Sequence, residues 1–109
     1  MKLFFENITE QERVSMDFPL EAVFGQVLEV FEQLPEEDGS TFGLVTEENM
    51  VIQFSKYNQF MWLVEIPDTE KHGVYQSICN RNQCVRFIEN LFLEKNPFDI
   101  CEFKFHSYL

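Results

Sequence analysis

The sequence has few basic residues: its 109 positions hold 8 Lys and Arg against 19 Asp and Glu, for a net charge of −11. Proteins bind phosphate groups through clustered lysine and arginine side chains, so this balance argues against direct binding of nucleic acid. It argues equally against binding to an anionic membrane surface. A protein partner with a basic surface is compatible with it.

Long apolar runs are also missing. No run approaches the roughly 18 residues that cross a membrane. The first fifteen residues carry several acidic and amide side chains and no apolar stretch typical of a secretion signal. We therefore expect a cytoplasmic protein that has no membrane partner.

Residue patterns typical of catalytic and metal-binding sites are absent as well. The sequence contains no glycine-rich phosphate loop, no G-x-S-x-G and no H-E-x-x-H. His72 and His106 have no histidine or cysteine at the spacing of metal ligands. The paired carboxylates lie in polar turns, whereas acid–base catalysis needs carboxylates in a cleft with separated pKa values. We expect no enzyme activity, no metal and no cofactor.

Cysteine is scarce and odd in number, which favours free thiols in a reducing compartment. Cys84 falls on a helical apolar stripe and Cys101 lies among phenylalanines, so both are expected to act as small core residues. Cys79 directly precedes a predicted helix start, where a thiolate is stabilised. No base accompanies it in the sequence, so we expect no catalytic role for it.

The residues that are present indicate one folded domain over residues 1–109. Hydrophobic residues make up 45% of the chain, and thirteen residues are phenylalanine, which favours a packed aromatic core over disorder. A chain of this length buries roughly two-thirds of its extended surface, so folding requires neither a disulfide nor a metal.

Two stretches show helical spacing. Apolar residues recur every three or four positions over residues 20–34, which predicts a helix. Asp17 is suited to cap its start, and Pro35 is suited to end it. A second helix is expected to follow Asn80, with Gln83 completing a capping box.

Strands are predicted between and around these helices, at residues 2–8, 42–46, 50–54, 60–66, 74–79 and 101–106. Short turns join the middle strands, which favours an antiparallel meander. The order is therefore strand, helix, four strands, helix, strand. We predict an α+β fold in which two helices pack on one face of an antiparallel sheet of about five to six strands.

The acidic residues are concentrated in one part of the chain. Between residues 14 and 55 there are nine acidic residues and no Lys or Arg, whereas residues 56–109 are nearly balanced. Several lie near the C-terminal end of the first helix, where the helix dipole prefers cations and each mismatch costs about 0.3–1 kcal/mol. Acidic residues that remain despite this cost indicate a binding partner. The alternative is that they only keep the protein soluble. The candidate partner-binding acids are Glu29, Glu32, Glu36, Glu37, Asp38, Glu47 and Glu48.

The sheet face turned away from the helices is a second candidate surface. Strand alternation predicts that this face carries Val45, Val51, Met61, Leu63 and Tyr75. Open antiparallel faces normally carry polar residues, so we expect it to be covered by the terminal segments, by a second copy in a homodimer, or by another protein. Its candidate binding residues are Met61, Leu63 and Glu65, with Glu65 interrupting an apolar patch.

The middle of the chain also carries a pattern typical of a known family. It reads Phe42-Gly43-Leu44-Val45, then Val51-Ile52-Gln53-Phe54, then Trp62-Leu63-Val64-Glu65-Ile66-Pro67, and in the following helix Cys84-Val85-Arg86-Phe87-Ile88. This order of meander and helix, over residues 42–92, resembles small bacterial immunity proteins of polymorphic or contact-dependent toxin systems. The resemblance implies a protein that occludes the active site of a basic toxin, often a nuclease, with an acidic surface.

Two other binding functions stay open. Chaperones of type III secretion also place a helix before a meander and form dimers, but this chain has a strand at both ends of the predicted order. An acidic mimic of nucleic acid would instead inhibit a DNA-binding enzyme, with the carboxylates of residues 29–48 in place of phosphates. All three hypotheses describe a protein that acts by binding.

Overall fold

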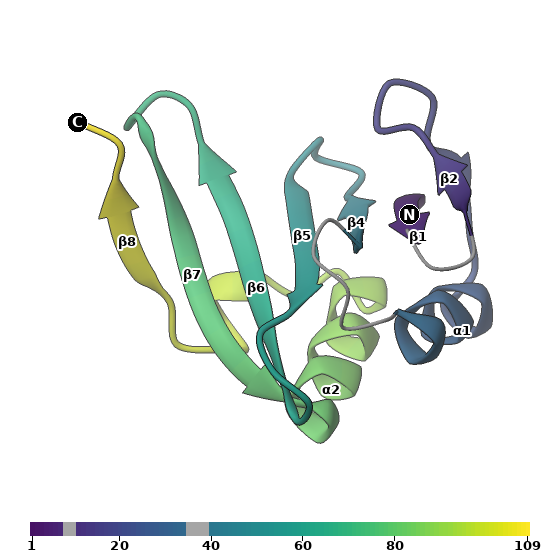
Figure 1. Ribbon diagram of the computed structural model, residues 1–109. Helices are drawn as coiled ribbons and strands as arrows, with labels where there is room; N and C mark the ends of the chain where they lie inside the picture. Colours follow the sequence, from purple (N-terminus) through teal and green to yellow (C-terminus); the bar gives the residue numbers. More distant parts are fainter. Residues whose placement is uncertain (8–10, 35–39) are drawn as a thin grey trace.

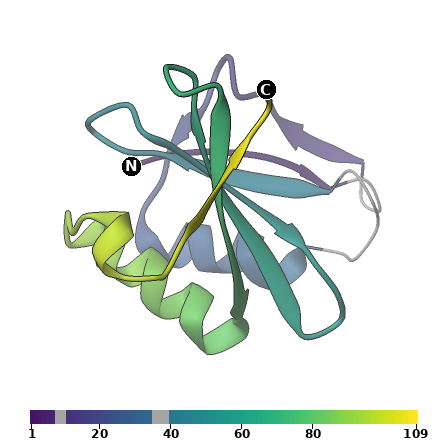
Figure 2. The same cartoon turned by 90° about the vertical axis from the view of Figure 1, so that its left-hand side faces the viewer.

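The computed structural model describes residues 1–7, 11–34 and 40–109. Within these residues, eight strands form one antiparallel sheet, and two α-helices cover one of its faces (Figures 1 and 2). The strands are β1 (Lys2–Asn7), β2 (Glu12–Val14), β3 (Leu20–Glu21), β4 (Thr41–Val45), β5 (Val51–Lys56), β6 (Met61–Asp68), β7 (Gly73–Asn80) and β8 (Lys104–Ser107). The helices are α1 (Phe24–Gln33) and α2 (Arg81–Phe92), and a single 3-10 turn, η1 (Pro97–Asp99), follows α2. The predicted α+β class is confirmed, but the predicted five to six strands are too few.

The strands follow the order β2-β1-β4-β5-β6-β7-β8, and β3 also pairs with β1. The meander from β4 to β7 is therefore confirmed, since each of these strands pairs with the next one in the chain. Both helices lie on the same side of the sheet, as the view in Figure 2 shows. This arrangement leaves the other side of the sheet without a helix.

The region between β1 and α1 differs from the sequence prediction. A loop and then a helix from Leu20 were expected, whereas β2 and β3 pair with opposite ends of β1. The N–H of Ala22 donates to the carbonyl of Met1 at 3.0 Å, so the backbone up to this point belongs to the sheet. The N-cap of α1 is consequently Val23 and not Asp17. Pairing with β1 gives hydrogen-bond partners to the backbone N–H and C=O groups that would otherwise have paired within a longer helix.

A phenylalanine-rich core fills the space between the sheet and the helices. Phe31 of α1 packs against Trp62 with ring centroids 4.9 Å apart, and Phe87 of α2 lies edge-on to Phe54 at 6.0 Å. Phe42 stacks on Phe54 at 4.5 Å. All four phenylalanines are fully buried, and each contributes about 1.5–3 kcal/mol by leaving water. The predicted aromatic core is confirmed.

Helix α2 begins where the sequence predicts. The side chain of Asn80 accepts a hydrogen bond from the N–H of Gln83 at 2.8 Å, and the side chain of Gln83 accepts one from the N–H of Asn80 at 2.8 Å. This reciprocal capping box satisfies two N–H groups that have no partner inside the helix. It also fixes the point at which β7 turns into α2.

The C-terminal strand begins later than predicted. A strand was expected over residues 101–106, but β8 pairs only with Gly73–Gln76, the first half of β7. The ring of Phe103 instead packs toward the core, 6.0 Å from Phe87. The segment that precedes β8 therefore does not pair with the second half of β7, Ser77–Asn80. A hollow lies at this edge of the sheet.

The sheet face without helices is mixed in character. The registers align one row of residues across six strands: Phe4, Gly43, Gln53, Glu65, Gln76 and Lys104. Val45, Val51, Met61 and Leu63 share this face, as predicted. The prediction for Tyr75 is wrong, because Tyr75 pairs with the buried Ile66 and packs against Phe98 on the helix side. Polar side chains in the row thus divide the apolar patch that the sequence predicts.

Candidate functional site

The predicted acidic residues near the end of α1 are only partly described. Glu29 and Glu32 are exposed on the second half of α1, whereas Glu36, Glu37 and Asp38 lie outside the described residues. Glu32 forms an ion pair with Arg81 at the start of α2. Exposed pairs of this kind contribute about 0–1 kcal/mol, so the pair leaves Glu32 available but partly neutralised.

The other predicted acids, Glu47 and Glu48, lie in the turn between β4 and β5 and are exposed. Glu47 and Glu21 both contact the amino group of Met1, each at 3.1 Å. The five residues of β4 extend over about 13 Å, and this turn follows the C-terminal end of the strand. The structure therefore places Glu47 and Glu48 beyond the C-terminal end of β4, away from Thr41 and its register partner Glu6.

Glutamates that the sequence reasoning missed join Glu29 at a small cavity. A cavity of about 190 Å³ between α1 and the β1–β2 hairpin is lined by Glu6, Glu12 and Glu29 together with Phe5 and other residues. The remaining lining residues in the described part of the chain are Asn7, Val30, Gln33 and Leu34. Glu12 escaped the sequence analysis because β2 was read as a loop, so no periodicity placed it beside α1.

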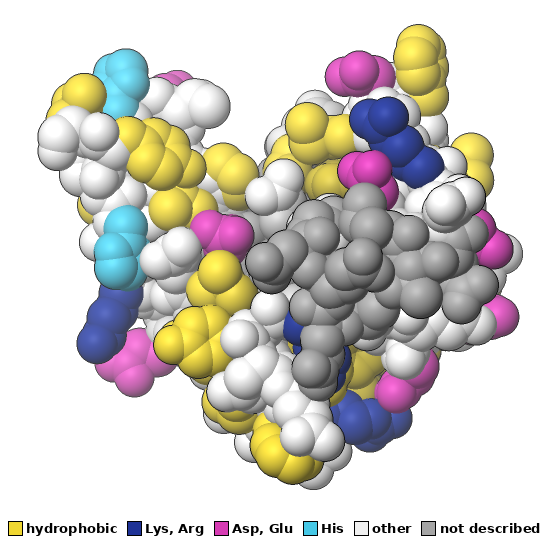
Figure 3. All heavy atoms as spheres, viewed as in Figure 1, with side chains coloured by type: hydrophobic (Ala, Val, Ile, Leu, Met, Phe, Trp, Pro, Cys, Tyr) yellow, Lys and Arg dark blue, Asp and Glu magenta, His cyan; other side chains and the backbone are white. Residues whose placement is uncertain are grey.

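The electrostatics of this acidic cavity favour a cation. It lies at the C-terminal half of α1, whose dipole is negative at that end and whose last turn contains no basic residue. No Lys, Arg or His is among its described lining residues, and residues 8–10 and 35–39 contain none in the sequence. Arg13 is the register partner of Glu6, but no ion pair joins these two described residues. In Figure 3 acidic side chains appear along the right-hand edge of the molecule, over β2 and α1.

The predicted outer-face residues lie together on β6. Met61, Leu63 and Glu65 point to the same side of the sheet, and all three are half-buried. Glu65 accepts a hydrogen bond from the side-chain amide of Gln76 at 2.9 Å. This bond engages Glu65 within the sheet, so the face offers a partner a polar stripe flanked by apolar side chains.

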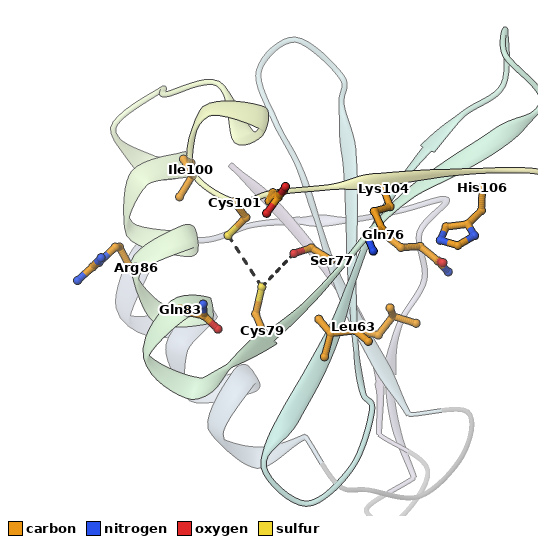
Figure 4. A pocket seen from close by; sticks show the side chains of 12 residues that line it. Leu63, Gln76, Ser77, Cys79, Gln83, Arg86, Ile100, Cys101, Lys104 and His106 are labelled. Atoms are coloured by element: carbon orange, nitrogen blue, oxygen red, sulfur yellow. Dashed lines mark hydrogen bonds between the residues drawn. The ribbon is translucent and has the colours of Figure 1, made fainter.

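A larger hollow, which the sequence did not reveal, occupies the edge of β7. Its volume is about 520 Å³, and β7, α2 and residues 100–106 form its walls (Figure 4). The side chains around it include Leu63, Ser77, Cys79, Gln83, Arg86, Cys101, Lys104 and His106. Three of these are basic or imidazole side chains in an acidic protein, and two are thiols.

The thiols meet at the inner wall of this hollow. Cys79 is buried, with 2% of its surface exposed, and its Sγ lies 3.9 Å from Sγ of the half-buried Cys101 and 3.4 Å from Oγ of Ser77. Hydrogen bonding with Cys101, and then with Cys84 and Ser77, lowers the pKa of Cys79, while its burial opposes this shift. Hydrogen bonding to Cys79, followed by burial, raises the pKa values of Cys84 and Cys101. Cys79 is therefore the thiol of the three that ionises first.

Within residues 1–7, 11–34 and 40–109, no helix is both long and apolar enough to cross a membrane. No group of three His, Cys, Asp or Glu side chains in the same part of the chain is arranged to hold a metal ion. In comparisons with protein-family models, curated proteins and solved structures, nothing matches this chain.

Proposed function

We propose that this chain is a cytoplasmic binding domain of the immunity-protein type, which inhibits a basic protein such as a toxin by covering its active site. The observation that carries this proposal is the one-sided charge of residues 14–55, which hold nine acids and no Lys or Arg. The resemblance of residues 42–92 to immunity proteins supports the same conclusion. Inhibition by occlusion requires no catalytic group on the inhibitor.

The described acids of this region are available to a partner. The exposed carboxylates are Asp17, Glu21, Glu29, Glu32, Glu47 and Glu48. In the described ion pairs, Glu32 contacts Arg81, and Glu21 and Glu47 share the amino group of Met1. The described ion pairs do not include Asp17, Glu29 or Glu48. A basic partner would be steered toward such a surface and would bind it with electrostatic complementarity.

The acidic cavity beside α1 suits a lysine or arginine side chain of that partner. Phe5 and Val30 supply apolar walls for an aliphatic stem, and Glu12 and Glu29 supply carboxylates for the charged head. Long basic side chains bind in this manner because their stems and their charged ends have opposite solvation preferences. The cavity thus gives the broad acidic surface one defined contact point.

Exposed apolar residues at the other end of α1 add a contact of a different kind. Phe18 is 81% exposed and Val23 is 66% exposed, and Met16 and Leu20 are exposed beside them in the sequence. The ten residues of α1 span about 15 Å between this apolar group and the acidic cavity. Apolar anchors next to guiding charges are typical of protein interfaces, in which a few buried side chains provide most of the affinity.

The experiment uses the polypeptide encoded next to this chain's own gene as the candidate toxin. We expect that polypeptide alone to arrest bacterial growth and this chain to restore it on co-expression. Calorimetry of the purified pair then tests the surface: Glu29→Lys is expected to weaken binding by about tenfold, or about 1.4 kcal/mol, and to reduce its salt dependence. Glu89→Lys is the matched control, since Glu89 is exposed on α2 in the nearly balanced half of the chain.

The outcomes separate the competing functions. A neighbouring polypeptide that is harmless, or whose toxicity this chain does not relieve, contradicts the immunity proposal. Equal weakening by Glu29→Lys and Glu89→Lys assigns the effect to net charge and removes the α1 surface from the mechanism. An obligate dimer on size-exclusion chromatography, together with binding of a secreted effector, supports the secretion-chaperone alternative.

A further inference from the structure

The hollow at the edge of β7 brings together two thiols that lie 22 residues apart in the sequence. Cys79 is the penultimate residue of β7, and Cys101 follows η1. Their sulfurs are 3.9 Å apart, and Figure 4 shows Cys79 between Cys101 and Ser77 at the inner wall of the hollow. Both residues line a space of about 520 Å³, which is large enough to admit a small oxidant.

We propose that Cys79 and Cys101 form a redox-sensitive pair, a modification site that small hydroperoxides convert from two thiols into one disulfide. Because the two residues belong to different elements, the bond would join the edge of β7 to the segment before β8. It would cover the edge of β7 that has no pairing with β8. This inference is independent of the proposed toxin inhibition.

The chemistry has two steps. The thiolate of Cys79 attacks one oxygen of the hydroperoxide, the O–O bond breaks, and the departing alkoxide or hydroxide takes up a proton, which leaves a sulfenic acid on Cys79. The sulfur of Cys101 then attacks Sγ of Cys79, the S–O bond breaks, and water leaves with the thiol proton. Two thiols are oxidised to one disulfide, and the hydroperoxide is reduced to water or an alcohol.

The surroundings assign distinct roles to the thiols. Cys79 lies within hydrogen-bonding distance of Ser77 and Cys101, and these contacts lower its pKa and favour its thiolate, the nucleophilic form, so it reacts first. Cys101 is half-buried at the hollow and is the resolving thiol. To form the bond, its sulfur must approach from 3.9 Å to about 2.05 Å, which requires rotation of short side chains.

Cys84 provides an internal control. It is fully buried in the first turn of α2 and does not line the hollow. A peroxide molecule in the hollow therefore meets Cys79 and Cys101 but not Cys84. Oxidation is expected to stop at one disulfide and one remaining thiol.

The test treats the reduced full chain with hydrogen peroxide and counts free thiols after denaturation. We expect three free thiols to fall to one, and non-reducing peptide mapping to connect Cys79 with Cys101. Cys84→Ala is expected to fall from two thiols to none. The Cys84→Ala/Cys101→Ala double variant is expected to form no intramolecular disulfide and to accumulate a sulfenic acid on Cys79 that dimedone traps.

Several results would overturn the proposal. Retention of all three thiols in the native protein, a disulfide that includes Cys84, or cross-links only between molecules would each do so. Circular dichroism establishes that the Cys84→Ala/Cys101→Ala double variant is folded, and the peptide map of the unmodified sequence decides the outcome without any variant. Growth rescue by the oxidised and reduced forms reports separately on the proposed function.

Discussion

Gly43 is the position where the structure makes its sharpest prediction about stability. A Cβ at Gly43 would lie 2.0 Å from Cζ of Phe4, whose ring crosses the glycine on the sheet face without helices. Ordinary contact requires about 3.5–4.0 Å, so the ring must move by roughly 1.5–2 Å. Phe4 is only 6% exposed, and overpacking of this kind typically costs about 1–3 kcal/mol. We expect Gly43→Ala to lower the free energy of unfolding by that amount.

Removal of the Phe4 ring should reverse the sign of the stability change that Gly43→Ala causes. In a Phe4→Ala background the added methyl group meets no ring, and alanine is favoured over glycine in a strand by about 0.5–1 kcal/mol. Gly43→Ala should therefore stabilise the Phe4→Ala protein slightly. The double-mutant cycle isolates the coupling between the two residues, which we expect to be about 1.5–4 kcal/mol.

Urea unfolding of the four proteins measures these values, with constant m-values as the test that only stability has changed. Gly25→Ala is the matched control, because a Cβ at Gly25 in α1 meets nothing within 4 Å. It should stabilise the protein by up to about 1 kcal/mol, as expected for a helical glycine. The reasoning is refuted if Gly43→Ala is as stable as the parent protein, or if its effect is the same with and without Phe4.

Two further predictions concern α2 and β6. Asn80→Ala removes the capping hydrogen bond to Gln83 and should cost about 1 kcal/mol, seen as a lower urea midpoint; no change would show that water replaces the cap. Leu63 is half-buried, so Leu63→Asp should leave the protein folded. Val64 is fully buried, so Val64→Asp should lower the free energy of unfolding by more than about 4 kcal/mol and abolish cooperative thermal unfolding. Loss of folding in Leu63→Asp would instead show that its face of the sheet is covered.

Local patterns identified much of this fold. The period-2 alternation around Phe54 and Val64 marked the buried face of β5 and β6, because the two faces of a strand are set by sequence alone once one face is buried. The Asn80–Gln83 capping box likewise located the start of α2, since its hydrogen bonds connect residues three positions apart. The face of Tyr75 was misassigned because a polar connection separates β7 from β6. The alternation of side chains along β6 therefore does not predict which residues of β7 share its faces.

In the candidate sites too, local sequence predicted some features and the fold alone determined others. The sequence located the excess of acidic residues, a property of composition, but not the cavity where Glu6 and Glu12 join Glu29. That cavity exists because β2 pairs with β1, a contact between segments whose own periodicity is weak.

The sequence by itself determined the acidic charge, the aromatic core, the central meander and the start of α2, because each depends on composition or on residues close together in the chain. Only the tertiary structure decided that β3 would replace the first turn of a longer helix and that β8 would pair with half of β7. It also decided that Cys79 and Cys101 would lie 3.9 Å apart. These outcomes depend on which distant backbone groups compete for the same partners, and no local pattern encodes that competition.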